Sequence, residues 1–388
     1  MLRSAFFIRL ISIVTLLHVY IGVRLVPALP TGTPFKWLAA LLLVASVLLI
    51  PLGMAARNIK KQPLSDRLAW AGLLMMGCFS SLLVLTVLRD ILLLLLYAVN
   101  SVRGATAATG DFTAASALCV PLFAILLTLL GVYYARRNAP VKIIDVPIAG
   151  LAAALNGFRI VQISDIHIGP TIKRGYVEKI VATVNALNAD LIAVTGDVVD
   201  GSVPQLEADA RPLGALSARH GTFFVTGNHE YYAGADAWIA EFRRLGFKVL
   251  MNEHVVVNHD GARAVVAGVT DYGGGNFDPA HASDPQKAMG GAPGDILFRL
   301  LLAHQPRSAT AASAAGFTLQ LSGHTHGGQF LPWQFFVRLQ QPFVHGLAKL
   351  DDLWVYTSRG TGYWGPPIRL AAPSEVTLLR LVADPPAV

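Results

Sequence analysis

The sequence predicts an N-terminal bundle of membrane-spanning helices followed by a layered α/β domain. Two observations lead to this fold class. The mean hydropathy is +0.52 and only 14% of residues are charged, against about a quarter in soluble domains. Beyond about Val141, short β-type runs alternate with helical segments, which is typical of a layered α/β domain. We therefore expect a transmembrane region over residues 1–140 and a second domain over residues 141–388.

Four apolar stretches in the first part each approach the ~20 residues that a helix needs to cross a bilayer. A secretory signal peptide has a shorter apolar core and a small-residue cleavage site, and three further stretches follow the first one. The pattern therefore predicts a multi-pass bundle. The four stretches are Phe6–Pro27, Trp37–Met54, Leu68–Leu88 and Leu118–Tyr134.

Positive charge is concentrated in the membrane part of the chain. Residues 1–140 hold 12 Lys and Arg against 3 Asp and Glu, whereas the remainder holds 19 against 21. Cations commonly flank membrane spans, and the second part lacks a basic patch with interleaved aromatic residues. We therefore exclude nucleic acid as a partner. Cys78 and Cys119 both lie in apolar runs, which argues against a disulfide framework.

The loop charges predict an orientation through the positive-inside rule. Basic residues follow the second and the fourth stretches, whereas the loop after the third stretch is balanced. The N-terminus and the α/β domain are then cytoplasmic. The basic residues are Arg57, Lys60, Lys61, Arg67, Arg136, Arg137 and Lys142.

Two features of the third stretch leave alternatives open. The apolar tail Ile91–Val99 could form an extra span or a re-entrant piece, which would change the side of the domain. Arg89 and Asp90, just before it, could mark a functional site inside the membrane. We prefer the alternative that they form an interfacial pair at a helix end.

The second part contains ten predicted strands and three predicted helices. The helices are Gly175–Asn188, Asp236–Leu245 and Pro306–Ala315. The strands are Phe158–Ser164, Leu191–Thr195, Thr222–Thr226, Lys248–Met251, Val255–Asn258, Ala264–Val269, Arg299–Ala303, Thr318–Ser322, Leu353–Ser358 and Val376–Leu381.

Five of these strands are followed at once by side chains that can bind metal. Sites in open α/β sheets collect at the carboxyl ends of strands. Carboxylate, imidazole and amide groups together suit Mn²⁺, Fe or Zn²⁺. Seven candidate ligands exceed the need of one ion, and two ions roughly 3.5–4 Å apart that share a carboxylate would use them all. The five clusters are Ser164–His167, Gly196–Asp200, Gly227–Glu230, Ala303–Gln305 and Gly323–Gly328.

This ordered series of motifs (DxH, GDVVD, GNHE, a lone His and GHTH) closely resembles the calcineurin-like metallophosphoesterases over roughly Phe158–Leu381. The tail motifs Ser358–Gly362 and Pro366–Arg369, with Gly327–Gln329, resemble membrane-associated bacterial members, which implies a bacterial inner membrane as the location. The resemblance implies a four-layer α-β-β-α sandwich. It also implies a two-metal hydrolase of phosphoester or phosphoanhydride bonds, with Mn²⁺ as the preferred ion and Fe or Zn²⁺ as alternatives.

The resemblance also implies a role for each site residue. In this family pattern a hydroxide that bridges the two metals attacks phosphorus in line, and His229 assists the leaving group. His229 could instead only brace the turn at Asn228. Asp200 and Glu230 would orient histidines or loops, or else act in helix capping or at the surface. The implied ligands are Asp165, His167 and His326 for the first metal, Asn228, His304 and His324 for the second, and Asp197 for both.

The substrate is left open between two classes. The membrane anchor and the apolar segment Phe330–Leu350 favour a lipid-linked substrate, such as UDP-diacylglucosamine by analogy, whereas a soluble phosphodiester is the alternative. That segment could be an apolar lip that meets lipid beside the metals, or, as we prefer, a buried insertion packed on the sheet. A non-catalytic membrane scaffold is a third possibility, which the complete ligand set disfavours. The sequence does not predict the oligomeric state.

Overall fold

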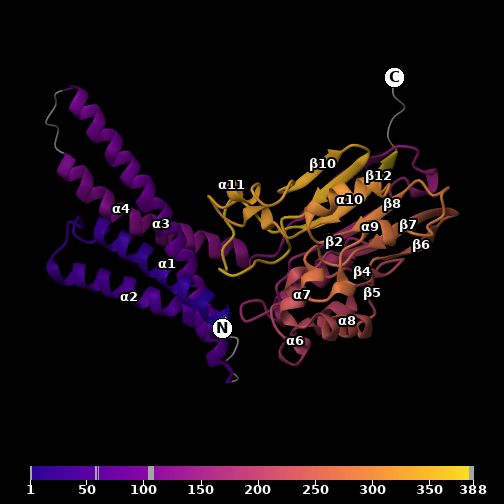
Figure 1. Ribbon diagram of the computed structural model, residues 1–388, viewed down its shortest axis with the longest axis horizontal. Helices are drawn as coiled ribbons and strands as arrows, with labels where there is room; N and C mark the ends of the chain where they lie inside the picture. The colour runs from indigo at the N-terminus through magenta and orange to yellow at the C-terminus, as the bar shows by residue number, and fades with distance from the viewer. Residues whose placement is uncertain (1, 57–58, 60, 104–108, 384–388) are drawn as a thin grey trace. The chain divides into compact units, whose positions relative to one another are not determined.

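The computed structural model describes residues 2–56, 59, 61–103 and 109–383. The chain forms two compact units (Figure 1). One comprises Met1–Tyr134 with Gly365–Ile368, and the other comprises Ala135–Trp364 with Arg369–Val388. The predicted boundary at residue 140 stays a prediction.

Among its described residues, the first unit contains four helices that are long and apolar enough to cross a membrane. They are α1 (Leu2–Leu25), α2 (Thr33–Ala55), α3 (Leu64–Arg103) and α4 (Thr109–Arg136). The tail Ile91–Val99 continues α3 as one helix of 40 residues and adds no span of its own. Of the basic residues used for orientation, Arg57 and Lys60 lie outside the described residues.

Arg89 and Asp90 lie in the middle of α3 rather than at a helix end. The Asp90 carboxylate accepts hydrogen bonds from Arg24 at 2.7 Å and from Tyr20 at 2.8 Å, and Arg89 is buried. Arg24 belongs to the last turn of α1. The pair therefore lies at the level where α1 ends, which fits an interfacial position although the expected helix end is absent.

The second unit is built on two six-stranded sheets. The first has the order β1-β12-β2-β3-β4-β5 and the second the order β10-β11-β9-β8-β7-β6. Strands β2 to β5 are parallel, and so are β11, β9, β8 and β7. The first sheet consists of β1 (Val141–Ile148), β12 (Val376–Ala383), β2 (Arg159–Ile163), β3 (Leu191–Val194), β4 (Thr222–Phe224) and β5 (Lys248–Val249). The second consists of β10 (Gly346–Leu350), β11 (Leu353–Thr357), β9 (Leu319–Ser322), β8 (Arg299–Leu302), β7 (Ala262–Gly268) and β6 (Glu253–His259).

Three apolar cores hold the sheets and helices together as four layers. The middle core joins the facing sides of the two sheets, for example Ile160 and Phe223 with Leu300 and Leu321. The other face of the first sheet packs on α5 (Arg174–Asn185), α6 (Val203–Ala210) and α8 (Ala235–Arg244). The other face of the second sheet packs on α9 (Pro285–Met289) and α10 (Ala309–Ala314). The predicted α-β-β-α order is confirmed (Figure 1).

Two strands were not predicted, and both lie at the outer edge of a sheet. Strand β1 carries Lys142, Asp145 and Pro147 within eight residues, and β10 is only partly buried. Edge strands have one unpaired side and carry more polar residues than central ones. Their apolar alternation is therefore too weak to recognise in the sequence.

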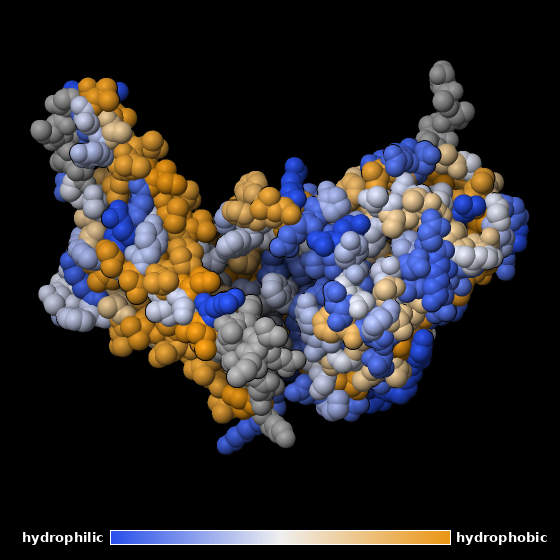
Figure 2. Space-filling model, in the orientation of Figure 1, coloured by the Kyte–Doolittle hydropathy of each residue, from blue (hydrophilic) through white to orange (hydrophobic). Residues whose placement is uncertain are grey.

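The interpretation of Phe330–Leu350 as a buried insertion is only partly correct. Phe343 and Leu350 pack on the outer core of the second sheet, and Gly346–Leu350 forms its strand β10, but the residues before them are largely exposed. The segment is therefore not buried as a whole. It contains the short helix α11 (Gln334–Val337), and several of its large apolar side chains face solvent. Figure 2 shows an apolar patch over α11. The exposed residues are Leu331, Trp333, Phe335, Phe336 and Leu339, with exposed fractions from 41% to 81%.

Candidate metal centre

All five predicted clusters meet at one edge of the second unit. Three of them follow the parallel strands β2, β3 and β4 of the first sheet, and two follow β8 and β9 of the second. The register pairs Ile163 with Val194, and Leu302 with Leu321, so neighbouring loops leave their sheet at the same level. The middle core stacks the sheets face to face and brings the two sets of loops together.

The backbone at this edge is strained. Non-glycine residues hold left-handed φ values at several ligand positions, including 53° at Asp165, 53° at Asp197 and 71° at His324. Each such conformation costs about 1 kcal/mol or more. Hydrogen bonds between the loops hold these turns, such as His324 N to the Asp165 carboxylate at 2.9 Å and His229 N to Asp197 at 2.8 Å.

Two glycines permit the close approach of these loops. A Cβ atom on Gly227 would lie 2.2 Å from Oδ1 of Asp197, and one on Gly323 would lie 2.1 Å from Oδ2 of Asp165. Any side chain at either position would displace a candidate ligand. The glycines of the GNHE and GHTH motifs are therefore required by packing at the site.

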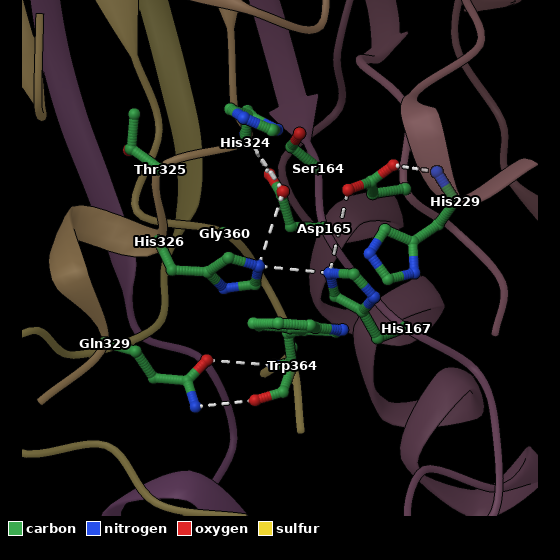
Figure 3. Close-up of polar contacts among 12 residues, drawn as sticks. Ser164, Asp165, His167, His229, His324, Thr325, His326, Gln329, Gly360 and Trp364 are labelled. Carbon is green, nitrogen blue, oxygen red and sulfur yellow. Dashed lines mark hydrogen bonds and ion pairs between the residues drawn. The ribbon is translucent and has the colours of Figure 1, made fainter. Parts of the chain in front are cut away.

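The candidate ligands form two groups of side-chain atoms. In the first, His167 Nε2 lies 3.0 Å from His326 Nε2, which is 3.5 Å from Asp165 (Figure 3). In the second, His304 Nε2 lies 3.1 Å from Asp197 and 3.2 Å from His324 Nδ1. Each group could hold a metal ion.

Asp197 and Asn228 complete the two groups. The carboxylate oxygen Oδ2 of Asp197 is 3.1 Å from His304 of one group and 4.0 Å from His167 of the other. Asn228 Oδ1 is buried without a hydrogen-bond partner. A buried oxygen of this kind normally has a partner, and a cation would supply one. The residues present therefore fit a pair of divalent ions.

Burial and charge set the protonation of the site. Burial and the charge of His304 lower the pKa of His324 to about 3, and burial and Arg369 hold the pKa of His326 well below its ordinary value. Burial opposes ionisation of Asp197, but the charge on His304 outweighs it and lowers that pKa. Neutral imidazoles and an ionised carboxylate are the forms that bind metal. Burial lowers the pKa of His304, but the charges of Asp197 and Asp165 outweigh it and raise that pKa, so His304 would release a proton when a metal binds.

Comparison with known proteins agrees with this geometry. Residues 158–328 match the model of the calcineurin-like phosphoesterase family. An uncharacterized metallophosphoesterase of Campylobacter jejuni is 35% identical over 278 residues, which cover 68% of this chain and 70% of that protein. The chain belongs to the calcineurin-like metallophosphoesterase family. Members usually use a dinuclear divalent metal centre, and membership supports a hydrolase acting on phosphoester bonds.

Other relatives extend beyond this domain. A zebrafish (Danio rerio) transmembrane protein with metallophosphoesterase domain is 38% identical over 274 residues, covering 67% of this chain. The match spans 62% of that relative's length. A 5'-nucleotidase precursor from Thermus thermophilus is similar in structure over 57% of this chain and 54% of that chain, at 18% identity and a TM-score of 0.38, which is too low to support an argument. Since animal and bacterial relatives both match, the bacterial branch stays a prediction.

Asp200 connects two histidines of the metallophosphoesterase site. Its Oδ1 lies 2.9 Å from His167 Nδ1 and 2.6 Å from His229 Nδ1. Burial lowers the pKa of His229, but the carboxylates of Asp197 and Asp200 outweigh it and raise that pKa to about 9. The predicted orienting position of Asp200 and the position of His229 beside the ligands are thus both present in the structure.

Glu230 ties two ligand loops together. It is fully buried, and its carboxylate accepts hydrogen bonds from the main-chain N–H groups of Asp197, Val198 and Gly227 at 2.7–2.9 Å. The last of these bonds caps helix α7 (Asn228–Ala233). Burial and the charge of Asp197 raise the pKa of Glu230 to about 7. Glu230 thus contacts two ligand loops and the start of α7, and its role in the site stays a prediction.

Three residues near the site had no role assigned from the sequence. Arg369 is fully buried, and its guanidinium lies 3.0 Å from His326 Nδ1 and donates to the His326 carbonyl at 2.9 Å. Gln329 bonds both main-chain groups of Trp364 (Figure 3). Arg369 and Gln329 belong to the tail motifs, so their place in those motifs was the available signal, whereas Trp364 had none.

Proposed function

We propose that the chain is a membrane-anchored hydrolase of phosphoester bonds that acts at this dinuclear centre. Asp165, His167 and His326 would hold one ion, and Asp197 would be shared. The second ion would be held by Asn228, His304 and His324. The orphaned, buried oxygen of Asn228, which follows Gly227 in a ligand loop, is the observation that carries the proposal. When bound, two divalent ions lower the pKa of a coordinated water and neutralise charge on phosphate oxygens.

The chain's own contribution to catalysis would come from His229. The Asp200 carboxylate accepts a hydrogen bond from His229 Nδ1 at 2.6 Å, which fixes the ring and supports its protonated form. A protonated imidazole can donate a proton to the departing oxygen, a contribution of about 10²–10⁴-fold in rate. Removing the ring with His229→Ala should lower kcat by about that factor and leave metal content unchanged. Loss of both metals in this variant would show that His229 only braces the turn at Asn228.

The enzyme proposal has a direct test with a matched control. The full chain in detergent, loaded with Mn²⁺, should hydrolyse bis-p-nitrophenyl phosphate, whereas Asp197→Ala should be inactive. Asp295→Ala removes an exposed carboxylate of the same domain and should keep wild-type activity, since Asp295 only pairs with Arg263 on the surface. Wild-type hydrolysis no faster than that of Asp197→Ala, with Mn²⁺, Fe²⁺ or Zn²⁺, would refute the proposal.

The chemistry of the donor atoms supports a proposal for the native metals. Carboxylates, imidazoles and one amide oxygen suit Mn²⁺, Fe or Zn²⁺, and we propose Mn²⁺ as the preferred ion. Elemental analysis of protein purified without added metal should find two ions per chain. A single ion, or none in protein that still turns over substrate, would contradict the dinuclear centre.

We also propose that the metallophosphoesterase domain faces the cytoplasm. The basic residues after α2 and α4 support this orientation. A reporter enzyme that works only in the cytoplasm should be active when it is fused at the C-terminus. The same reporter should be inactive when it is inserted between α3 and α4. Equal behaviour of the two fusions would refute the orientation.

A lipid-linked substrate is supported by the exposed apolar side chains of residues 331–339. Monomeric proteins rarely expose a large contiguous apolar patch unless it binds something, and only four residues separate α4 from β1. Phe335→Ser and Phe336→Ser should slow hydrolysis of a phosphodiester lipid in mixed micelles but not of a soluble diester. Leu297→Ser, at another exposed apolar position, is the control. Equal effects on both substrates would favour the soluble class.

A further inference from the structure

His229 lies beside exposed aromatic rings that have no role in the proposed hydrolysis. Its ring centroid lies 5.2 Å from that of Tyr232 and 5.8 Å from that of Trp364, both in edge-to-face geometry. Tyr232 is in turn 5.7 Å from Phe277. The exposed fractions of these rings are 62% for Tyr232, 54% for Trp364 and 55% for Phe277. We call Trp364, Tyr232 and Phe277 the aromatic row.

The position of Trp364 is built into the fold rather than left to a mobile loop. Gln329, which is buried, donates from Nε2 to the Trp364 carbonyl at 2.8 Å and accepts from the Trp364 N–H at 2.9 Å. Gln329 directly follows the GHTHGG loop and holds a left-handed φ of 58°. The same turn that presents His326 therefore also clamps Trp364 beside the candidate centre (Figure 3).

The far end of the row is acidic. Phe277 also borders a surface hollow lined by Tyr231, Asp236, Asp278 and His281. The described lining of this hollow contains two carboxylates and no Lys or Arg. Like charges repel, so a group that carries further phosphates is disfavoured there, whereas a neutral or cationic group is accepted.

We propose that the aromatic row is the binding site for the leaving alcohol of the substrate, and that this alcohol carries an aromatic or extended apolar body without further phosphate groups. The inference rests on the proposed function, because the metals place the phosphate and His229 marks the side on which the leaving oxygen departs. It narrows that function to phosphoesters of such an alcohol and away from phosphoanhydrides. Stacking of one ring on an aromatic side chain contributes ~1–3 kcal/mol, or about 5- to 150-fold in affinity.

Binding of inert analogues tests the row without turnover. Methylphosphonate monoesters of methanol, benzyl alcohol and 2-naphthylmethanol are titrated by calorimetry into the Mn²⁺-loaded full chain. The 2-naphthylmethyl ester should bind about tenfold or more tightly than the methyl ester. Trp364→Ala should bring this ratio close to one and Trp364→Phe should keep part of it. Leu297→Ala, which removes an exposed apolar side chain outside the aromatic row, should keep the ratio fully.

The hydrogen bonds between Gln329 and Trp364 and the acidic hollow beside Phe277 allow two further measurements. Gln329→Leu should reduce the ratio while leaving affinity for the methyl ester unchanged. A 4-trimethylammonio-benzyl ester should bind more tightly than a 4-carboxybenzyl ester, and Asp278→Asn should weaken that preference. Equal affinity of all esters in the wild type, no binding of any ester, or a ratio that survives Trp364→Ala would overturn the inference. If the ratio holds but bis-p-nitrophenyl phosphate is not hydrolysed, only the proposed function fails.

Discussion

The buried guanidinium of Arg369 offers the sharpest test of how the site is held. Its exposed fraction is 0%, and it makes five hydrogen bonds to four acceptor atoms. Three of these are the main-chain carbonyls of Gly362, His326 and Ala372, and the fourth is His326 Nδ1. Arg369→Met keeps much of the side-chain volume but removes every donor.

The size of the effect follows from those contacts. A hydrogen bond to a charged group contributes about 1.5–3 kcal/mol, and an acceptor left buried without a donor costs about 1–3 kcal/mol. Such terms are not additive, and removing the buried cation recovers part of its desolvation energy. We therefore expect a loss of about 3–5 kcal/mol in the free energy of unfolding, as is typical when one partner of a buried charged contact is removed. For a domain of this size that loss lowers Tm by roughly 6–20 °C.

The assay is thermal unfolding of the full chain in detergent, followed by intrinsic fluorescence, with metal content measured in parallel. Arg369→Met should also weaken metal binding about 10- to 100-fold, because His326 loses the group that orients it. Arg380→Met is the matched control, since Arg380 forms an exposed pair with Asp145 and such pairs contribute about 0–1 kcal/mol. The positioning role of Arg369 is refuted if both variants bind metal as tightly as the wild type and have Tm values within 2–4 °C of it. That difference corresponds to about 1 kcal/mol.

Three further predictions follow from the same contacts. Asp200→Asn should lower kcat about 10- to 100-fold even at saturating metal, because the amide cannot support protonated His229; unchanged kcat would contradict the role of this contact. Gly72→Leu should lower the Tm of the helix bundle, because a Cβ atom at this position would lie 2.5 Å from Gly53 Cα. Gly110→Leu should leave that Tm unchanged, because a Cβ atom at this position would meet nothing within 4 Å. Chelation of both metals should lower Tm by roughly 10 °C or more, since an ion at 100 times its Kd contributes about 2.7 kcal/mol; a Tm independent of chelator would argue against bound metal.

The sequence predicted the four apolar helices, the helices α5, α8 and α10, the layers and the clusters of candidate ligands because each depends on local pattern. The short helices α6, α7, α9 and α11 were not predicted. An apolar run followed by Asp, His or Asn is visible within about ten residues, and parallel strands bring such endings to one edge. Asp165 and Asp197 illustrate this, since each lies two or three residues beyond its strand. The five clusters could therefore be placed together before any contact was known.

Contacts between distant residues could not be predicted in this way. Gln329 and Trp364 are 35 positions apart, and His326 and Arg369 are 43 positions apart. Spacing along the chain does not show which side chain will meet which acceptor when both lie in irregular loops. The solvent exposure of a segment could not be predicted either, because an apolar run such as the one around Phe335 has the same composition whether it is buried or faces solvent.

Without bound metal, the geometry of the candidate centre is energetically unfavourable in several respects. Asp165 and Asp197 are 0% and 2% exposed, and burial together with the charge of Asp197 raises the pKa of Asp165. Several ligand turns are left-handed at non-glycine residues, and Asn228 Oδ1 lacks a partner. Each of these terms is unfavourable, and a bound cation relieves the charge and the orphaned oxygen together. We infer that metal binding and the local stability of these loops are strongly coupled, so that metal-free protein should open first at this edge and exchange its amide hydrogens there faster than in the sheet cores.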